Sequence, residues 1–159
     1  MKIETINKEN LTDRDRTDFG DMLKKQGKVK GDPYSKADRC KVICFAKIDN
    51  EIVGIGGLKE RTNSAFTKEK ANLMEMRQLF NWELGYLYTS ENHRGLGVAS
   101  KIVVKLLNIH GDENLMASTE IEENPGMVKI LERHGFEQKG ETWKSGIHED
   151  ILGLYIKLK

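Results

Sequence analysis

An arginine and two glycines lie close together at one point of the chain. Arg94, Gly95 and Gly97 follow a run of strand formers at 83–89 and precede a run of helix formers at 101–110. The first N–H groups of a helix have no partner within it, and the helix dipole adds partial positive charge there. Glycines lack the Cβ atoms that would keep a phosphate from the backbone, and arginine adds a forked cation. The pattern predicts an anion site that suits a pyrophosphate.

Two widespread phosphate-binding motifs do not fit this stretch. The Walker motif needs Gly-Lys-Ser/Thr, which the chain lacks. The dinucleotide fingerprint G-x-G-x-x-G would begin at Gly95, but its third glycine is replaced by Ser100. A nucleotide-phosphate-binding domain of another class is therefore disfavoured.

The flanking sequence predicts which elements position this turn. Thr12 as a cap and Gly27 as a terminator predict a helix between them. Two apolar runs around Asp-Asn-Glu at 49–51 predict a hairpin. A second helix is expected from about 97 to Gly111, with Val98, Ile102, Leu106 and Ile109 on one side. Further strands are expected at 2–6, 83–89, 114–122, 136–144 and 150–159, and a third helix from the cap Asn124 to Gly135.

Strands that alternate with helices, with a hairpin at each end, predict a mixed α/β sheet. Residues 60–81 are polar and aperiodic, and loops of that length are often functional or partly helical. With 159 residues and no linker, the chain is expected to form one domain spanning 1–159.

The composition of the chain limits which partners and which cellular environment are expected. The formal net charge of +1 provides no global basic field, so nucleic acid is not expected as a partner. No apolar run is long enough to span a membrane, and the first ten residues are too polar for a signal peptide. Cys40 and Cys44 are expected to be free thiols, which suits a reducing cytoplasm.

The order Arg94, Gly95, Leu96, Gly97, Val98, Ala99 resembles the signature of the GNAT superfamily of acetyl-CoA-dependent N-acetyltransferases. The resemblance continues downstream in Asn124, the helix after it and the Gly135–Phe136 pair, and upstream in the strand at 83–89. It covers nearly the whole chain. It implies an α+β fold, with a mixed, mostly antiparallel sheet, splayed central strands and flanking helices.

The resemblance also implies how acetyl-CoA binds. The turn from Arg94 to Ala99 would hold the pyrophosphate, and backbone groups of Leu87, Tyr88 and Thr89 would bond the pantetheine arm. Asn124 would contact the pantetheine or the acyl end. Its alternative role is that of a helix cap with no ligand.

Transfer of an acetyl group requires a base, because a protonated amine cannot attack a thioester. Glu83 matches the glutamate that some family members use, and its alternative role is a solvated carboxylate at a strand end. Glu120 and Glu122 are lesser candidates. Many members carry a tyrosine that protonates the leaving thiolate; this chain has Leu131 there. Tyr86 or Tyr88 could replace it, although strand tyrosines more often pack.

The sequence therefore predicts an N-acetyltransferase that moves an acetyl group to a primary amine without a covalent enzyme intermediate. The alternative is a non-catalytic acyl-CoA-binding module of the same fold, which Leu131 favours. The acceptor, a small molecule or a protein amine, and assembly as a homodimer stay open. The four histidines are scattered without metal-ligand spacing, so no metal is expected.

Overall fold

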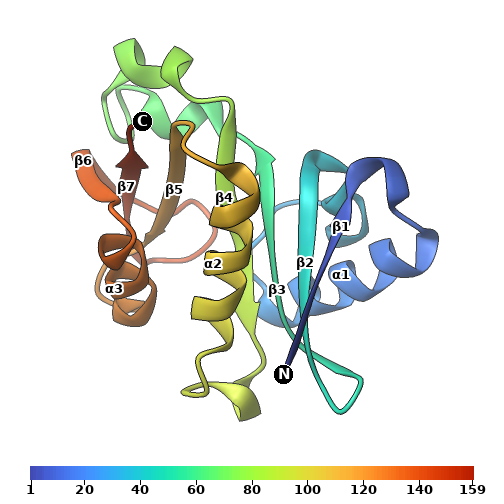
Figure 1. The fold of residues 1–159 in the computed structure, drawn as a ribbon. Coiled ribbons are helices and arrows are strands. Elements are labelled where there is room, and N and C mark those ends of the chain that lie inside the picture. Colours follow the sequence, from blue (N-terminus) through green and yellow to red (C-terminus); the bar gives the residue numbers. More distant parts are fainter. The chain divides into compact units, whose positions relative to one another are not determined.

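The computed structural model describes residues 1–159 and contains seven strands and three α-helices (Figure 1). Neighbouring strands pair in the order β1-β2-β3-β4-β5-β7-β6. The β1–β2, β2–β3, β5–β7 and β6–β7 pairs are antiparallel, and β4 is parallel to β5. The fold is α+β, as expected. The elements are β1 (Lys2–Asn7), α1 (Asp13–Gln26), β2 (Cys40–Ile48), β3 (Glu51–Glu60), β4 (Trp82–Thr89), α2 (Val98–His110), β5 (Leu115–Glu120), α3 (Pro125–Arg133), β6 (Glu137–Lys144) and β7 (Ile151–Lys157).

The chain divides into two compact units. The first comprises Met1–Lys59 and Leu84–Gly111, and the second comprises Glu60–Glu83 and Asp112–Lys159. Strand β4 begins in the second unit and continues into the first, with the division between Glu83 and Leu84. That the whole chain acts as one domain stays a prediction.

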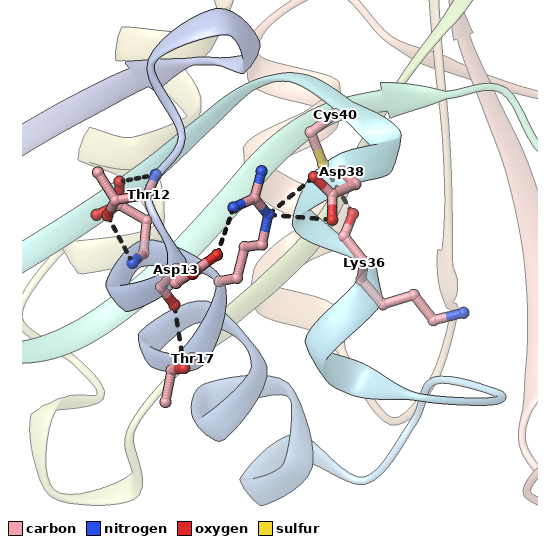
Figure 2. Close-up of polar contacts among 8 residues, drawn as sticks. Thr12, Asp13, Thr17, Lys36, Asp38 and Cys40 are labelled. Carbon is pink, nitrogen blue, oxygen red and sulfur yellow. Dashed lines mark hydrogen bonds and ion pairs between the residues drawn. The ribbon is translucent and has the colours of Figure 1, made fainter.

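Helix α1 starts and stops where its sequence indicates, and Figure 2 shows the polar contacts around its start. The Thr12 hydroxyl accepts a hydrogen bond from the Asp15 N–H at 3.1 Å, and the Asp15 carboxylate accepts one from the Thr12 N–H at 3.0 Å. Arg16 then links Asp13 of the first turn to Asp38 of the short 3₁₀ helix Ala37–Arg39. Gly27 ends the helix in the left-handed conformation, with φ 72°. Two backbone donors at the start of α1 are thus satisfied by side chains.

The predicted hairpin is present, and it sets the two faces of the first unit. Asp49 and Asn50 both have positive φ, 51° and 65°, as a two-residue turn between twisted strands requires. Because side chains alternate along a strand, Phe45 and Ile55 point to one face, where they pack against Phe19 of α1. Helix α2 covers the opposite face.

Glycines of β3 let α2 approach the sheet closely. A Cβ atom on Gly54 would lie 2.5 Å from Val98 Cγ1, and one on Gly56 would lie 2.7 Å from Ile102 Cγ2. Real side-chain atoms do not approach so closely, so these positions must lack a side chain for α2 to lie where it does. The first turn of α2, which carries the glycine turn, is therefore fixed against the sheet.

The second unit builds its core from strands and from the segment before β4. Residues 60–81 were expected to be a loop or partly helical, and they contain two 3₁₀ helices, Asn63–Phe66 and Met74–Leu79. The segment is also a core element, because Phe66 and Phe80 are fully buried and stack with ring centroids 5.8 Å apart. The other buried members of this cluster are Ala65, Ala71, Met116, Trp143, Leu154 and Ile156.

Backbone contacts join this segment to β6. The Glu141 N–H donates to the Ala71 carbonyl at 2.9 Å, and Asn72 Nδ2 donates to Glu141 Oε2 at 2.7 Å. Gly140, with φ 73°, lies so close to the Ala71 carbonyl that a Cβ atom there would collide with it. A polar sequence without periodicity thus folds by pairing with a distant strand.

Two expectations about side chains have clear outcomes. On α2, Val98, Ile102 and Leu106 are buried, whereas Ile109 is 42% exposed in the last turn. Cys40 and Cys44 are free and buried, as predicted. Burial raises the pKa of the Cys44 thiol to about 12, so it is protonated and unreactive at neutral pH.

None of the helices combines the length and the apolar character that crossing a membrane would demand.

Candidate active site

The turn from Arg94 to Ala99 is open. Gly95 and Gly97 have φ values of 83° and 80°, and an added Cβ atom would meet nothing within 4 Å at either position. Gly97 is the N-cap of α2, and no side chain caps this helix. Leu96, between the glycines, is 57% exposed, while Val98 is buried and anchors the helix. The turn therefore presents the backbone N–H groups at the start of a 13-residue helix, without a protein side chain across them.

Arg94 is exposed and held at the edge of this turn. Its Nε donates to the Thr89 carbonyl at 3.3 Å, which links the guanidinium to the end of β4. The Ser90 N–H donates to the Val53 carbonyl at 2.9 Å, which fixes that strand end to β3. A guanidinium beside an open helix start is suited to a polyanion.

The predicted pantetheine-contacting residues Leu87, Tyr88 and Thr89 are half-buried on β4. The Leu87 carbonyl accepts a hydrogen bond from Gln26 Nε2 at 3.0 Å, so α1 contacts this strand. Just before them Tyr86 has φ 56°, which is rare for a bulky residue in a strand and marks a local distortion of the backbone. The strand is thus irregular in the stretch where the resemblance places a ligand.

Glu83 is not a solvated carboxylate. It is 6% exposed on β4, and its Oε1 accepts a hydrogen bond from the Thr62 N–H at 2.8 Å. Its strand partner across the parallel pair is Met116. The alternative reading, a strand-end glutamate facing water, is wrong, because the segment that starts at Glu60 folds over it. A buried and oriented carboxylate is what a general base requires, and its role as base stays a prediction.

Asn124 caps α3, as its sequence position suggested. Its Oδ1 accepts a hydrogen bond from the Met127 N–H at 3.3 Å, and its Nδ2 is 3.5 Å from Thr119 Oγ1. The capping role is therefore present, while a contact with a ligand stays a prediction. Asn124 belongs to the second unit, as does Glu83.

One group of side chains was not anticipated from the sequence. Glu120, a lesser candidate for the base, is 6% exposed at the end of β5, and His148 and Asp150 of the turn before β7 lie beside it. Glu122, the other lesser candidate, is exposed. In the sequence His148 and Asp150 are 28 and 30 residues from Glu120, and the antiparallel pairing of β5 with β7, with Glu120 opposite Leu152, brings them together.

Comparison with known proteins decides the family. The sequence profile described as the acetyltransferase (GNAT) family matches residues 7–136. The chain belongs to the acetyltransferase (GNAT) family. No curated protein sequence matches the chain significantly. Members of the GNAT family are acyltransferases that use acetyl-CoA, so the chain is assigned to that class of enzyme.

Solved structures confirm the GNAT fold. An acyl-CoA N-acyltransferase from Pseudomonas aeruginosa superposes with a TM-score of 0.69 at 12% identity, covering 98% of each chain. A ribosomal-protein-alanine N-acetyltransferase from Brucella melitensis gives 0.67 at 14% identity over 100% of each chain. The yncA protein of Salmonella typhimurium, solved with its cofactor acetyl-CoA, gives 0.65 at 11% identity over 99% of this chain and 93% of that one.

Leu131 stands where many GNAT members have a tyrosine, and it is part of the packed interior. Leu131 is 1% exposed on α3, and its carbonyl accepts the N–H groups of His134 and Phe136 that end the helix. Tyr86 and Tyr88, the suggested substitutes for the missing acid, both pack against the core of the first unit. Tyr86 also meets Phe19 edge to face, with ring centroids 6.0 Å apart. The structure thus supports packing roles for both tyrosines.

Proposed function

We propose that the protein is an N-acetyltransferase that moves the acetyl group of acetyl-CoA directly to a primary amine. The observation that carries this proposal is the open turn of Arg94, Gly95 and Gly97 at the uncapped start of α2. Its N–H groups and guanidinium suit the pyrophosphate of CoA. The backbone of Leu87–Thr89 and the side chain of Asn124 would contact the pantetheine and acyl end.

In the proposed reaction Glu83 accepts a proton from the ammonium form of the acceptor, directly or through a water molecule. The neutral nitrogen then attacks the thioester carbonyl carbon, the carbon–sulfur bond breaks with departure of CoA thiolate, and the nitrogen releases its second proton to solvent to give the amide. A thiol with a pKa of about 8.5 leaves as a thiolate near neutral pH without a dedicated acid. Leu131 in place of the usual tyrosine is therefore compatible with turnover.

Release of CoA thiol from acetyl-CoA in the presence of a panel of amines tests this proposal. The panel should include polyamines, amino acids and peptides with a free N-terminus. We expect amine-dependent thiol release from the wild-type protein. CoA binding without any thiol release would indicate an acyl-CoA-binding module and contradict catalysis.

Glu83→Gln tests the role of the base. Glutamine keeps an oxygen that can accept the hydrogen bond from the Thr62 N–H but cannot take up a proton. General-base catalysis typically contributes about 10²–10⁴-fold, so kcat/KM should fall by roughly that factor at pH 7. CoA affinity should stay unchanged.

The deficit of Glu83→Gln should shrink as pH rises toward the acceptor pKa, about 10.4 for a lysine-like amine, because more amine is then already neutral. Glu51→Gln, at an exposed glutamate of β3, removes the same charge and should retain full activity. Full activity of Glu83→Gln at pH 7 would place the base elsewhere.

We further propose that the chain acts as one domain in the cytoplasm, where a reducing environment keeps Cys40 and Cys44 as thiols. Both residues are free and buried, which is consistent with that location.

A further inference from the structure

Two carboxylates lie close to one imidazole in the second unit. His148 Nε2 is 3.8 Å from Glu120 Oε1, and His148 Nδ1 is 3.2 Å from Asp150 Oδ2. Each of the three residues offers one ligand atom, and these atoms all lie within 4.8 Å of one another. The group joins two elements, since Glu120 ends β5 and the other two residues belong to the turn between β6 and β7.

The electrostatics of this group favour a cation. The side chain of Glu120 is only 9% exposed, and those of His148 and Asp150 are 24% and 29% exposed. A buried carboxylate near a second one is costly unless positive charge is shared between them. A divalent metal ion among the three ligand atoms would share positive charge with both carboxylates.

The donor set narrows the class of ion. One imidazole nitrogen with two carboxylate oxygens suits first-row transition metals such as Zn²⁺, whereas Mg²⁺ and Ca²⁺ prefer oxygen ligands alone. Ligands about 2.0–2.2 Å from Zn²⁺ would lie closer together than 4.8 Å, so a bound ion would draw the three side chains inward. Two of the three stand on a turn, where such a shift disturbs no strand.

The turn already directs His148 toward Glu120. Ser145 Oγ accepts hydrogen bonds from the N–H groups of Ile147 and His148, at 3.1 and 3.3 Å. The Ser145 N–H donates to the Asp150 carbonyl at 3.0 Å and so closes the turn. Hydrogen bonds therefore hold the backbone on both sides of His148. Less conformational entropy is then lost when a bound ion orders the imidazole.

We propose that Glu120, His148 and Asp150 bind one divalent transition-metal ion, which ties the end of β5 to the turn between β6 and β7. The proposal departs from the sequence-based expectation that no metal is bound. It is independent of the acetyl-transfer proposal, because it requires neither CoA nor an acceptor. It also means that Glu120 is not the base.

Calorimetric titration of the chelator-treated full chain with Zn²⁺ tests this site. We expect one ion per chain, and much weaker heats with Mg²⁺. His148→Gln and Asp150→Asn should each weaken binding of Zn²⁺ by more than about tenfold, since even changes behind the ligands typically cost 10–100-fold. Glu149→Gln is the matched control: its exposed carboxylate stands between the two ligands in sequence but pairs with Lys144, so binding should not change.

Two further readouts separate this site from adventitious binding. Zn²⁺ should raise the Tm of the wild-type protein and of Glu149→Gln, but not that of His148→Gln, because only a bound ion stabilises the folded state. Visible absorption of Co²⁺ added in place of Zn²⁺ should report oxygen and nitrogen ligands without a thiolate band. If folded wild-type protein takes up no Zn²⁺, or if His148→Gln and Asp150→Asn bind it as tightly as wild type, the proposal is overturned.

Discussion

The first turns of α1 and α2 differ in what satisfies their unpaired backbone N–H groups. At α1, Thr12 and Asp15 satisfy backbone donors through a reciprocal pair of hydrogen bonds (Figure 2). At α2, Gly97 supplies no side chain, and nothing caps the helix. Both helices are long enough to carry a dipole, with 14 and 13 residues. The start of α1 is thus closed by its own side chains, whereas the start of α2 is open, as the proposed CoA site requires.

The two starts also differ in what holds them in place. The cap of α1 consists of local hydrogen bonds, and the Arg16–Asp38 ion pair is its one described link to a later segment, whereas the start of α2 is held by packing of Val98 and Ile102 against the glycines of β3. A local contact needs only neighbouring residues, but this packing needs the hairpin, the helix and the strand order together. Changes in β3 should therefore affect the proposed CoA site more than changes at the α1 cap.

The largest effect is expected from Gly54→Leu. Even a Cβ atom at this position would lie 2.5 Å from Val98 Cγ1 and 3.1 Å from Ile102 Cδ1. Overpacking should cost about 1–3 kcal/mol in the free energy of unfolding, measured with denaturant, and CoA affinity should fall as the start of α2 shifts. Gly126→Leu is the control, because a Cβ there meets nothing within 4 Å. Wild-type stability and affinity for Gly54→Leu would show that α2 is not set by this packing.

Arg94→Ala tests whether the positive charge beside the start of α2 contributes to CoA affinity. The side chain is exposed, so folding stability should change by less than about 0.5 kcal/mol. CoA affinity should fall about tenfold at low salt and by less at high salt, because ions screen the attraction. Arg14→Ala removes an exposed cation from the first turn of α1 and should leave CoA affinity unchanged. Equal affinities for the two variants would separate Arg94 from the ligand.

Thr12→Ala should have the smallest effect, and only on stability. Loss of the cap typically costs about 0.5–2 kcal/mol, which thermal or denaturant unfolding would detect. CoA affinity should stay at the wild-type value, because the cap serves α1 alone. A drop in CoA affinity at unchanged stability would contradict the division between a closed and an open helix start.

Local signals in the sequence were sufficient to predict most helices, strands and turns. Thr12, Gly27 and Asn124 mark helix ends through contacts within a few residues, and Asp49 and Asn50 specify a turn on their own. The glycine turn was also predictable, since it depends only on the residues at one helix start. These features require no knowledge of distant partners.

Features that depend on distant partners were not predictable. Glu83 is buried and accepts a hydrogen bond from the Thr62 N–H, which belongs to a segment without hydrophobic periodicity. Phe66 and Phe80 of the same segment join a core cluster with residues of β5, β6 and β7, and the Ala71 carbonyl of the segment accepts a hydrogen bond from the Glu141 N–H of β6. The proximity of Glu120 and His148 likewise depends on the register of β5 with β7.

The central claim is that the open turn at α2 binds CoA, and a matched pair of glycine variants tests it most directly. Gly97 and Gly27 share the left-handed conformation, with φ/ψ of 80°/16° and 72°/19°, and both face open space. Gly97→Trp and Gly27→Trp should therefore suffer similar backbone strain of about 1–3 kcal/mol. In calorimetric titration with CoA, Gly97→Trp should lose at least about tenfold in affinity because its side chain blocks the phosphates, while Gly27→Trp binds like wild type. Wild-type CoA affinity in a folded Gly97→Trp protein would contradict the assignment.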